Sequence, residues 1–378
     1  MNGHKAIIIA GLILGYSLPA FSQMEASLKI GVILPRSGPL APYSDQIVAG
    51  MEVALEELEA INPKARNLIT LVFRDDKGSS STAYEQANEL YQREKVHAII
   101  GSLTSPASLA INDASIKNEK ILIVPSSSIT DVISNNPQGY SVSLSETKLG
   151  SMLGKFASNN LHKGRALLIT TEDSYFTLKS LGAFEAEFRQ NGGQTVGQIT
   201  YNPNDPQSLS AVAQAVQEKT PDVVVAPGYF AEVAPVMKHL VSQGVSVPFL
   251  GTDLWESPNF VETMGPEAGS GHYFITHFSA DDLSANVKEF VSEYEAATNK
   301  RPTSLAAMGY DSMKILLEAY LSTQSNRTPV LVRALEEAPE LQGLTGGIVF
   351  DRDRTAVKNG VIMATTSAGF KFITRFSM

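Results

Sequence analysis

Four hydroxyl side chains fall within seven positions of this sequence, directly after a short apolar run. They are Ser102, Thr104, Ser105 and Ser108, and the run before them spans 96–100. A β-branched run that ends in glycine predicts a buried strand, and the Ser-Pro-Ala-Ser-Leu-Ala that follows predicts the start of a helix. The first turn of a helix offers backbone N–H groups and the positive end of the helix dipole. The stretch therefore predicts a site for an anion such as a carboxylate.

A purely structural interpretation of the same residues is also open. Serine is a preferred N-cap, so Ser105 would only cap the helix, with Pro106 at the first helical position. The residues after the other predicted strands bear on the choice, because ligands in open α/β sheets bind beyond the carboxyl ends of the strands.

Those residues differ between the two halves of the chain. Hydroxyls recur in the first half, as in Ser126, Ser127 and Ser128, whereas aromatic residues and the acid Asp253 follow the strands of the second half. Hydroxyl and N–H groups suit a carboxylate, an acid suits an ammonium, and rings suit an apolar side chain. The combination favours a small zwitterion as ligand.

The elements that must position these residues alternate along the chain. Strands are predicted at 28–35, 69–76, 96–100 and 121–126, and helices at 45–60, 83–93 and from Pro106 onward. Alternation of strand and helix predicts a parallel sheet with helices on both faces. The same rhythm resumes between 166 and 253. The sequence therefore predicts an α/β protein with two doubly wound, parallel-sheet lobes.

The end of the chain breaks the rhythm with three successive helices at 283–298, 304–321 and 330–337, followed by strands at 346–351 and 360–367. We expect the helices to return to the first lobe and the last strands to the second. Three crossings between the lobes follow, near Ser143, His277 and Thr345. The expected division is 27–143 plus 278–345 for lobe I and 144–277 plus 346–378 for lobe II. A cleft with several linkers suits hinge closure around a ligand.

The composition and the N-terminal residues indicate an exported protein and disfavour nucleic-acid-binding and metal-binding proteins. Residues 1–22 carry Lys5, an apolar core and small residues at Ala20 and Ser22, which is typical of a secretory signal peptide. Removing it changes the formal net charge from −9 to about −10, which disfavours nucleic-acid binding. The chain has no cysteine, and its six histidines show no metal-ligand spacing, so we expect no metal or other cofactor. An exported protein, most simply periplasmic and without membrane insertion after processing, is predicted.

Several motifs in order resemble one family. LPRSGPLAPYSDQIVAGMEVALEELEA, IIGSLTSPAS, IVPSSS, APGYFAEV, FLGTD and AAMGYDSMKILLEAY are similar to the branched-chain amino-acid-binding family of type I periplasmic solute-binding proteins, the receptors of ABC importers. The resemblance covers essentially the whole chain after the signal peptide. It implies the type I periplasmic binding protein fold and capture of a small ligand, most simply a branched-chain amino acid. It also implies delivery to an inner-membrane ABC permease, usually by a monomer.

The resemblance also implies a set of ligand-binding residues. Ser105 matches the serine that holds the ligand carboxylate, while Ser126 and Ser128 match the loop that meets both carboxylate and ammonium. Asp253 stands where the family commonly has an acid for the ammonium, often the longer Glu. The side-chain pocket is expected from the following residues: Tyr43, Leu103, Tyr175, Tyr229 and Phe278.

Alternatives remain open for some residues and for the function. Asp253 could instead cap the turn before Glu256, Trp255 could cover the ligand or close the cleft rim, and Tyr310 is expected to pack a helix. Ser145 and Lys148 fit S-x-x-K, but the companion motifs of the serine enzymes are absent, so we expect no enzyme. The runner-up functions are a sensor that signals to a chemoreceptor or kinase, and a binding protein for aromatic acids or short amides.

Overall fold

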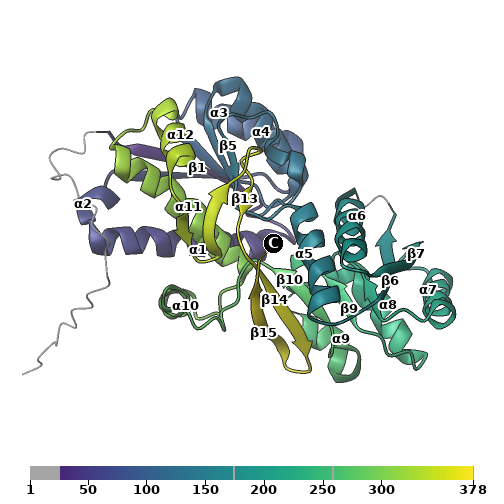
Figure 1. Ribbon diagram of the computed structural model, residues 1–378. Helices are drawn as coiled ribbons and strands as arrows, with labels where there is room; N and C mark the ends of the chain where they lie inside the picture. The colour runs from purple at the N-terminus through teal and green to yellow at the C-terminus, as the bar shows by residue number, and fades with distance from the viewer. Residues whose placement is uncertain (1–25, 173–174, 258, 378) are drawn as a thin grey trace, which may run out of the picture.

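The computed structural model describes residues 26–172, 175–257 and 259–377, which form two lobes, each built around its own β-sheet (Figure 1). We call the part built on the five-stranded sheet lobe I and the part built on the seven-stranded sheet lobe II. The predicted α/β class is confirmed in both lobes.

The sheet of lobe I has the order β2-β1-β3-β4-β5, and all its strand pairings are parallel. Successive residues of a strand point to opposite faces, so Ile30 and Val32 enter one core and Ile33 enters the other. The strands are β1 (Leu28–Leu34), β2 (Ile69–Asp75), β3 (Ala98–Gly101), β4 (Ile121–Val124) and β5 (Gly139–Ser141).

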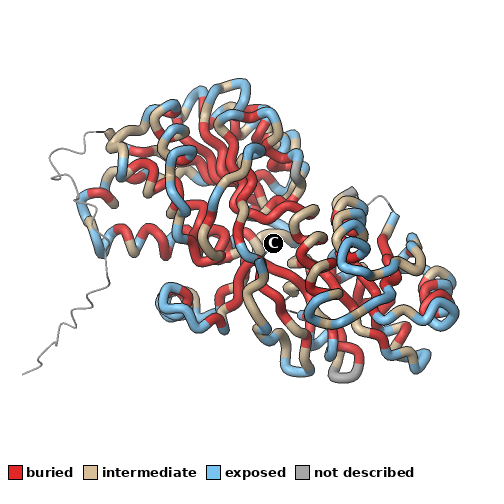
Figure 2. Tube along the Cα trace, in the orientation of Figure 1, coloured by how far each residue is buried: buried red, intermediate tan, exposed pale blue. Residues whose placement is uncertain are grey.

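Helices cover both faces of this sheet, and β1, β3, β4 and β5 are almost wholly buried, whereas the edge strand β2 is mostly half-buried or exposed (Figure 2). α3 and α4 pack on one face, while α1, α10, α11 and α12 contribute to the core on the other. The helical elements of this lobe are α1 (Ala41–Ile61), α2 (Pro63–Arg66), α3 (Ser80–Gln92), α4 (Ser105–Asn118), the 3-10 turn η1 (Thr130–Ile133), α10 (Ala285–Thr298), α11 (Ser304–Thr323) and α12 (Thr328–Glu337).

The sheet of lobe II has the order β15-β14-β10-β9-β8-β6-β7, with parallel pairing from β10 to β7 and antiparallel pairing at β14 and β15. α5 and α6 pack on one face, and α7, α8 and α9 pack on the other. The strands are β6 (Arg165–Thr171), β7 (Gln194–Tyr201), β8 (Val223–Val225), β9 (Phe249–Gly251), β10 (Tyr273–Thr276), β14 (Gly360–Thr366) and β15 (Gly369–Phe376). The helical elements are α5 (Glu146–Asn159), α6 (Tyr175–Gln190), α7 (Pro206–Lys219), α8 (Phe230–Ser242), the 3-10 turn η2 (Asp253–Trp255) and α9 (Phe260–Ala268).

The described chain passes between the two sheets after β5, after β10 and before β14. The strand expected at 346–351 does not join the second sheet. It is β12 (Gly346–Phe350), which pairs with β11 (Leu341–Gly343) and β13 (Ala356–Val357) in a small antiparallel sheet. The chain therefore reaches the second sheet for the last time at β14, later than Thr345.

In lobe I, α1 and α11 approach each other closely at two glycines. A β-carbon on Gly50 would lie 1.9 Å from the carbonyl oxygen of Ala306, and one on Gly309 would lie 2.1 Å from that of Ile47. Only a residue without a side chain fits at either position, so the two helices pack backbone to backbone. Among the described helices, none combines the length and apolar character that crossing a bilayer requires.

Candidate functional site

The hydroxyl residues of lobe I come together because they follow two neighbouring parallel strands, β3 and β4. The Ser126 hydroxyl donates to the carbonyl of Leu103 at 3.1 Å, and the Ser127 hydroxyl donates to the Ser105 hydroxyl at 2.7 Å. Two turns that are distant in sequence are thus tied into one surface. Ser128 is buried beside them, whereas Leu103 and Ser105 are half-buried.

The first turn of α4 has no side-chain cap. Thr104, not Ser105, is the N-cap residue, and its side chain makes no capping hydrogen bond; Ser105 and Pro106 are the first two helical residues. The interpretation of Ser105 as the N-cap was therefore wrong by one position. Because its hydroxyl does not serve the helix end, the positive end of α4 and the Ser105 hydroxyl can both serve an anion.

A buried acid that the sequence did not single out for the site lies next to these hydroxyls. Glu146 is fully buried at the start of α5, and its backbone N–H donates to the carbonyl of Ser128 at 2.9 Å. One carboxylate oxygen lies 3.8 Å from the ammonium of Lys179, which also lies 3.0 Å from Asp131 of lobe I. The start of α5 is thus tied to the Ser126–Ser128 turn through its backbone, while the buried Glu146 carboxylate faces Lys179.

The S-x-x-K motif has structural roles instead of catalytic ones. The Ser145 hydroxyl accepts from the backbone N–H of Lys148 at 3.3 Å and so caps α5. The Lys148 ammonium lies 2.6 Å from the carboxylate of Asp351 and donates to the carbonyl of Ala356 at 3.0 Å. Serine and lysine therefore point to different partners.

In lobe II, Asp253 follows β9 and contacts the strand crossing between the lobes. Its Oδ2 lies 3.3 Å from Nε2 of His277, which is fully buried, and burial lowers the pKa of that histidine. Its Oδ1 is buried and has no partner among the described residues. The backbone N–H of Glu256 bonds to the backbone carbonyl of Asp253, at 3.0 Å. The Asp253 side chain thus contacts the histidine, and the turn is closed by backbone groups.

The aromatic residues expected around the ligand occupy different places. Tyr229 precedes α8 and is 60 % exposed, and Tyr43 is half-buried in the first turn of α1. Tyr175 begins α6, but its side chain lies outside the described ones. Phe278 is 1 % exposed and packs edge-on against Phe290 at 5.8 Å in the core of lobe I, so the structure does not bring it to the site.

Two further aromatic residues belong to the cores. Trp255 is fully buried and its Nε1–H donates to the carbonyl of Ala226 at 3.1 Å, so it neither covers the cleft nor closes its rim. Tyr310 packs a helix as expected: its ring lies 5.3 Å from that of Phe290, and its hydroxyl contacts Glu57 of α1.

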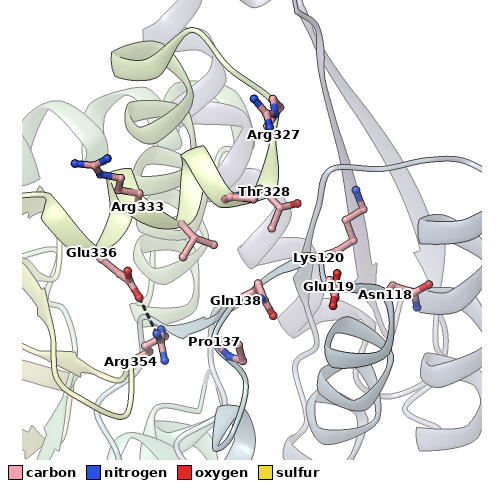
Figure 3. A pocket seen from close by; sticks show the side chains of 12 residues that line it. Asn118, Glu119, Lys120, Pro137, Gln138, Arg327, Thr328, Arg333, Glu336 and Arg354 are labelled. Carbon is pink, nitrogen blue, oxygen red and sulfur yellow. Dashed lines mark hydrogen bonds and ion pairs between the residues drawn. The ribbon is translucent and has the colours of Figure 1, made fainter.

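A charged groove of about 680 Å³ lies at the other end of the lobe I sheet. Figure 3 shows the side chains that line it. Lys120 and Gln138, which line it, directly precede β4 and β5, so the groove borders the amino ends of these strands. Arg354 and Glu336 pair across it at 2.6 Å. It is therefore separate from the hydroxyl turns, which follow the carboxyl ends. Within the described parts of the chain, no three potential ligands gather to hold a metal ion.

The comparisons with known proteins agree in fold and role. The family model described as "Periplasmic binding protein" matches residues 27–370. The Leu/Ile/Val-binding protein BraC3 of Rhizobium johnstonii is 21 % identical, with 88 % of this chain and 89 % of the relative covered. The crystal structure of a leucine-binding protein from Thermotoga maritima has 26 % identity and a TM-score of 0.81, covering 93 % of this chain and 99 % of the other. A branched-chain amino-acid-binding protein from Streptococcus pneumoniae, solved with isoleucine, has 25 % identity and a TM-score of 0.79, covering 92 % and 98 %.

Proposed function

Because this chain belongs to the periplasmic binding protein family, we propose that it captures an α-amino acid with an apolar side chain between its two lobes. The family is one of substrate-binding proteins, which make and break no covalent bond in their ligand. The observation that carries the proposal is the uncapped first turn of α4 with the Ser105 hydroxyl beside it. The buried acid Glu146 is bonded through its backbone to the neighbouring turn.

The two charged ends of an amino acid match these two features. The carboxylate would accept from the Ser105 hydroxyl and from N–H groups of the first turn of α4, where the helix dipole favours negative charge. The ammonium would lie between Ser128 and the carboxylate of Glu146, with Asp253 approaching from lobe II. A ligand that contacts both lobes stabilises the closed arrangement more than the open one, which is how binding drives closure.

The side chain of the ligand would meet Leu103 and Tyr43 of lobe I and the exposed ring of Tyr229 of lobe II. An exposed tyrosine at the start of α8 has a large apolar surface to cover when the lobes approach. These residues favour leucine, isoleucine or valine, the ligands that the names of several relatives give for those proteins.

The partners and the location follow from the same proposal. Closure would present both lobes to an inner-membrane ABC permease, which takes over the ligand. The signal peptide predicted at 1–22 lies outside the described residues, and its removal would leave a periplasmic protein that works as a monomer.

The experiment that tests the function measures thermal unfolding of residues 23–378, after refolding to remove bound ligand, with amino acids, short amides and aromatic acids. A ligand at 100 times its Kd adds about 2.7 kcal/mol to stability, which raises Tm measurably. We expect branched-chain amino acids to give the largest shift. If no amino acid raises Tm, the proposal is overturned. If aromatic acids alone raise it, the ligand is an aromatic acid instead of an amino acid.

The Ser105→Ala variant should bind L-leucine roughly 5- to 150-fold more weakly, because the ligand carboxylate loses a hydrogen bond of about 1–3 kcal/mol. Isothermal titration calorimetry measures the change. Ser158→Ala is the matched control, because Ser158 lies near the end of α5, where its hydroxyl donates to the carbonyl of Gly154 one turn earlier, and its loss should leave the affinity unchanged. An unaltered affinity of the Ser105→Ala variant would remove this residue from the site.

The Glu146→Gln variant should weaken L-leucine binding by about 1.5–3 kcal/mol, because an ammonium loses a charged partner that keeps its shape. The affinity for 4-methylpentanoate, which is leucine without the ammonium, should stay the same. The same two affinities, measured for the Asp253→Asn variant, show which of the two acids contributes more to binding the ammonium. If only the Asp253 variant discriminates between the two ligands, the ammonium is held from lobe II and Glu146 has a structural role.

A further inference from the structure

The turn that carries Asp253 is fastened to the strand crossing that follows β10. Asp253 contacts His277 of this crossing, and three residues later Glu256 accepts from the Thr276 hydroxyl at 3.1 Å. The Glu256 carboxylate also accepts from the hydroxyl and the backbone N–H of Ser304, at 2.6 and 3.2 Å, at the start of α11 in lobe I. Both acids of this turn are therefore attached to elements at the junction of the lobes, namely the crossing after β10 and, for Glu256, also the start of α11.

The protonation of His277 is set by what surrounds it. The charged groups that act on it are Asp253, Asp311 and the buried Lys358. Burial lowers the pKa of His277, so its ring is neutral at pH 7. A carboxylate can only accept, so the one ring proton is on Nε2 and is donated to Oδ2 of Asp253. The Nδ1 atom has no partner among the described residues. The histidine thus has a fixed donor directed at one carboxylate oxygen.

Within the described part of the chain, the other carboxylate oxygen has no hydrogen-bond partner. Oδ1 of Asp253 is buried without a partner in the described chain, and so is the hydroxyl of the preceding Thr252. A buried acceptor without a donor is unfavourable, and a charged one more so. An ammonium group supplies up to three N–H donors and a positive charge, which is what this oxygen lacks.

We propose that His277 is a positioning residue, which holds the Asp253 carboxylate so that its free oxygen receives an N–H of the ligand's ammonium. The inference rests on the proposed function and assigns the hinge crossing a part in ligand selection. An amino acid then gains from the Asp253–His277 pair, whereas the same molecule without its ammonium does not.

The test compares His277→Asn with His277→Gln by calorimetry on L-leucine and 4-methylpentanoate. The amide nitrogen of glutamine can occupy the place of Nε2, whereas that of asparagine is one carbon too short. We expect His277→Asn to weaken L-leucine about tenfold and 4-methylpentanoate less than twofold, and His277→Gln to restore most of the loss. Both substitutions are polar and smaller than histidine, and an unchanged thermal transition verifies that each variant folds.

Glu256→Gln is the matched control on the same turn. It weakens the attachments to Ser304 and Thr276 but removes no atom of the Asp253–His277 contact, so any effect should be equal for both ligands. If His277→Asn weakens both ligands equally, or neither, the positioning role is overturned while the amino-acid site stands. If the wild-type protein binds 4-methylpentanoate as tightly as L-leucine, the ammonium contributes nothing, and the proposed function falls together with the role of His277.

Discussion

Replacing Gly309 by alanine should lower the free energy of unfolding by about 3 kcal/mol, because the added methyl group would meet the carbonyl oxygen of Ile47 at 2.1 Å. The obstacle is the backbone of α1, which is held in its own helical hydrogen bonds and cannot rotate away as a side chain can. Urea denaturation followed by circular dichroism measures the loss. Gly50→Ala should behave alike, since its methyl group would meet the carbonyl of Ala306 on the facing helix.

The matched control is the same substitution in a helix with free space. Gly182 lies inside α6, and a β-carbon there has no neighbour within 4 Å. Gly182→Ala should therefore raise stability by roughly 0.5–1 kcal/mol through helix propensity. Equal effects at Gly309 and Gly182 would show that α1 and α11 are not in backbone contact.

Replacing Asp311 by alanine should cost about 3–5 kcal/mol at pH 7, because it removes a fully buried carboxylate that has several partners. The carboxylate accepts from the backbone N–H groups of Leu344 and Thr345, at 2.7 and 3.1 Å, and from the Thr345 hydroxyl at 2.5 Å. That hydroxyl in turn accepts from the buried Lys358 ammonium at 2.6 Å. The variant leaves both N–H groups and a buried cation without their acid.

The stability lost by the Asp311→Ala variant should be smaller at pH 9 than at pH 7, because Lys358 loses its charge between these values. Burial lowers the pKa of this lysine to about 8, so at pH 9 it is mostly neutral in the folded wild-type protein. Removing Asp311 lowers that pKa further, so the ionic part of the loss is present below pH 8 and disappears above it. Asp205→Ala, which removes only the N-cap of α7, should cost about 1 kcal/mol at both values. A loss at Asp311 independent of pH would mean that the lysine is not coupled to it.

The order of strands and helices could be predicted because hydrophobic spacing reports burial directly. The runs at 28–35 and 121–126 lie in strands with both faces covered, where nearly every residue is buried. The small sheet could not be predicted, because β11 and β13 have three and two residues and too little pattern to recognise. The strand β12 has an exposed Val349 and pairs with these neighbours instead of the second sheet.

The grouping of the hydroxyl residues could also be predicted, because parallel strands bring the residues after their carboxyl ends together. This rule alone was enough to predict that Ser105 and Ser126 lie close together. Glu146 was not predicted as a candidate because it is joined to the hydroxyl turns by a backbone bond to Ser128, 18 positions earlier, and nothing in its local sequence indicates burial. Phe278 was expected at the pocket from the resemblance alone, and Trp255 was left open between two roles at the cleft; both are buried in the cores, as large aromatic side chains often are.

The pairing of Asp253 with His277 lies beyond what spacing can reveal. Both residues follow strands of lobe II, but their contact depends on β9 and β10 being neighbours and on where the chain turns toward lobe I. The sequence indicates a histidine near a crossing and an acid near a strand end, and only the packed sheet shows which nitrogen meets which oxygen.

The contact between α1 and α11 also constrains the order in which the two lobes can fold during synthesis. Gln46, in α1, meets Thr303 at the start of α11, 257 residues later in the chain. A ribosome that adds 5–20 residues each second takes roughly 10 to 50 seconds to cover that interval. During this time the glycine-bearing, apolar side of α1 has no helix to cover it, although most of lobe II has already emerged. The nascent chain is therefore expected to complete its second lobe's helices and central strands before the core of its first can close, and to depend on a holding chaperone in between.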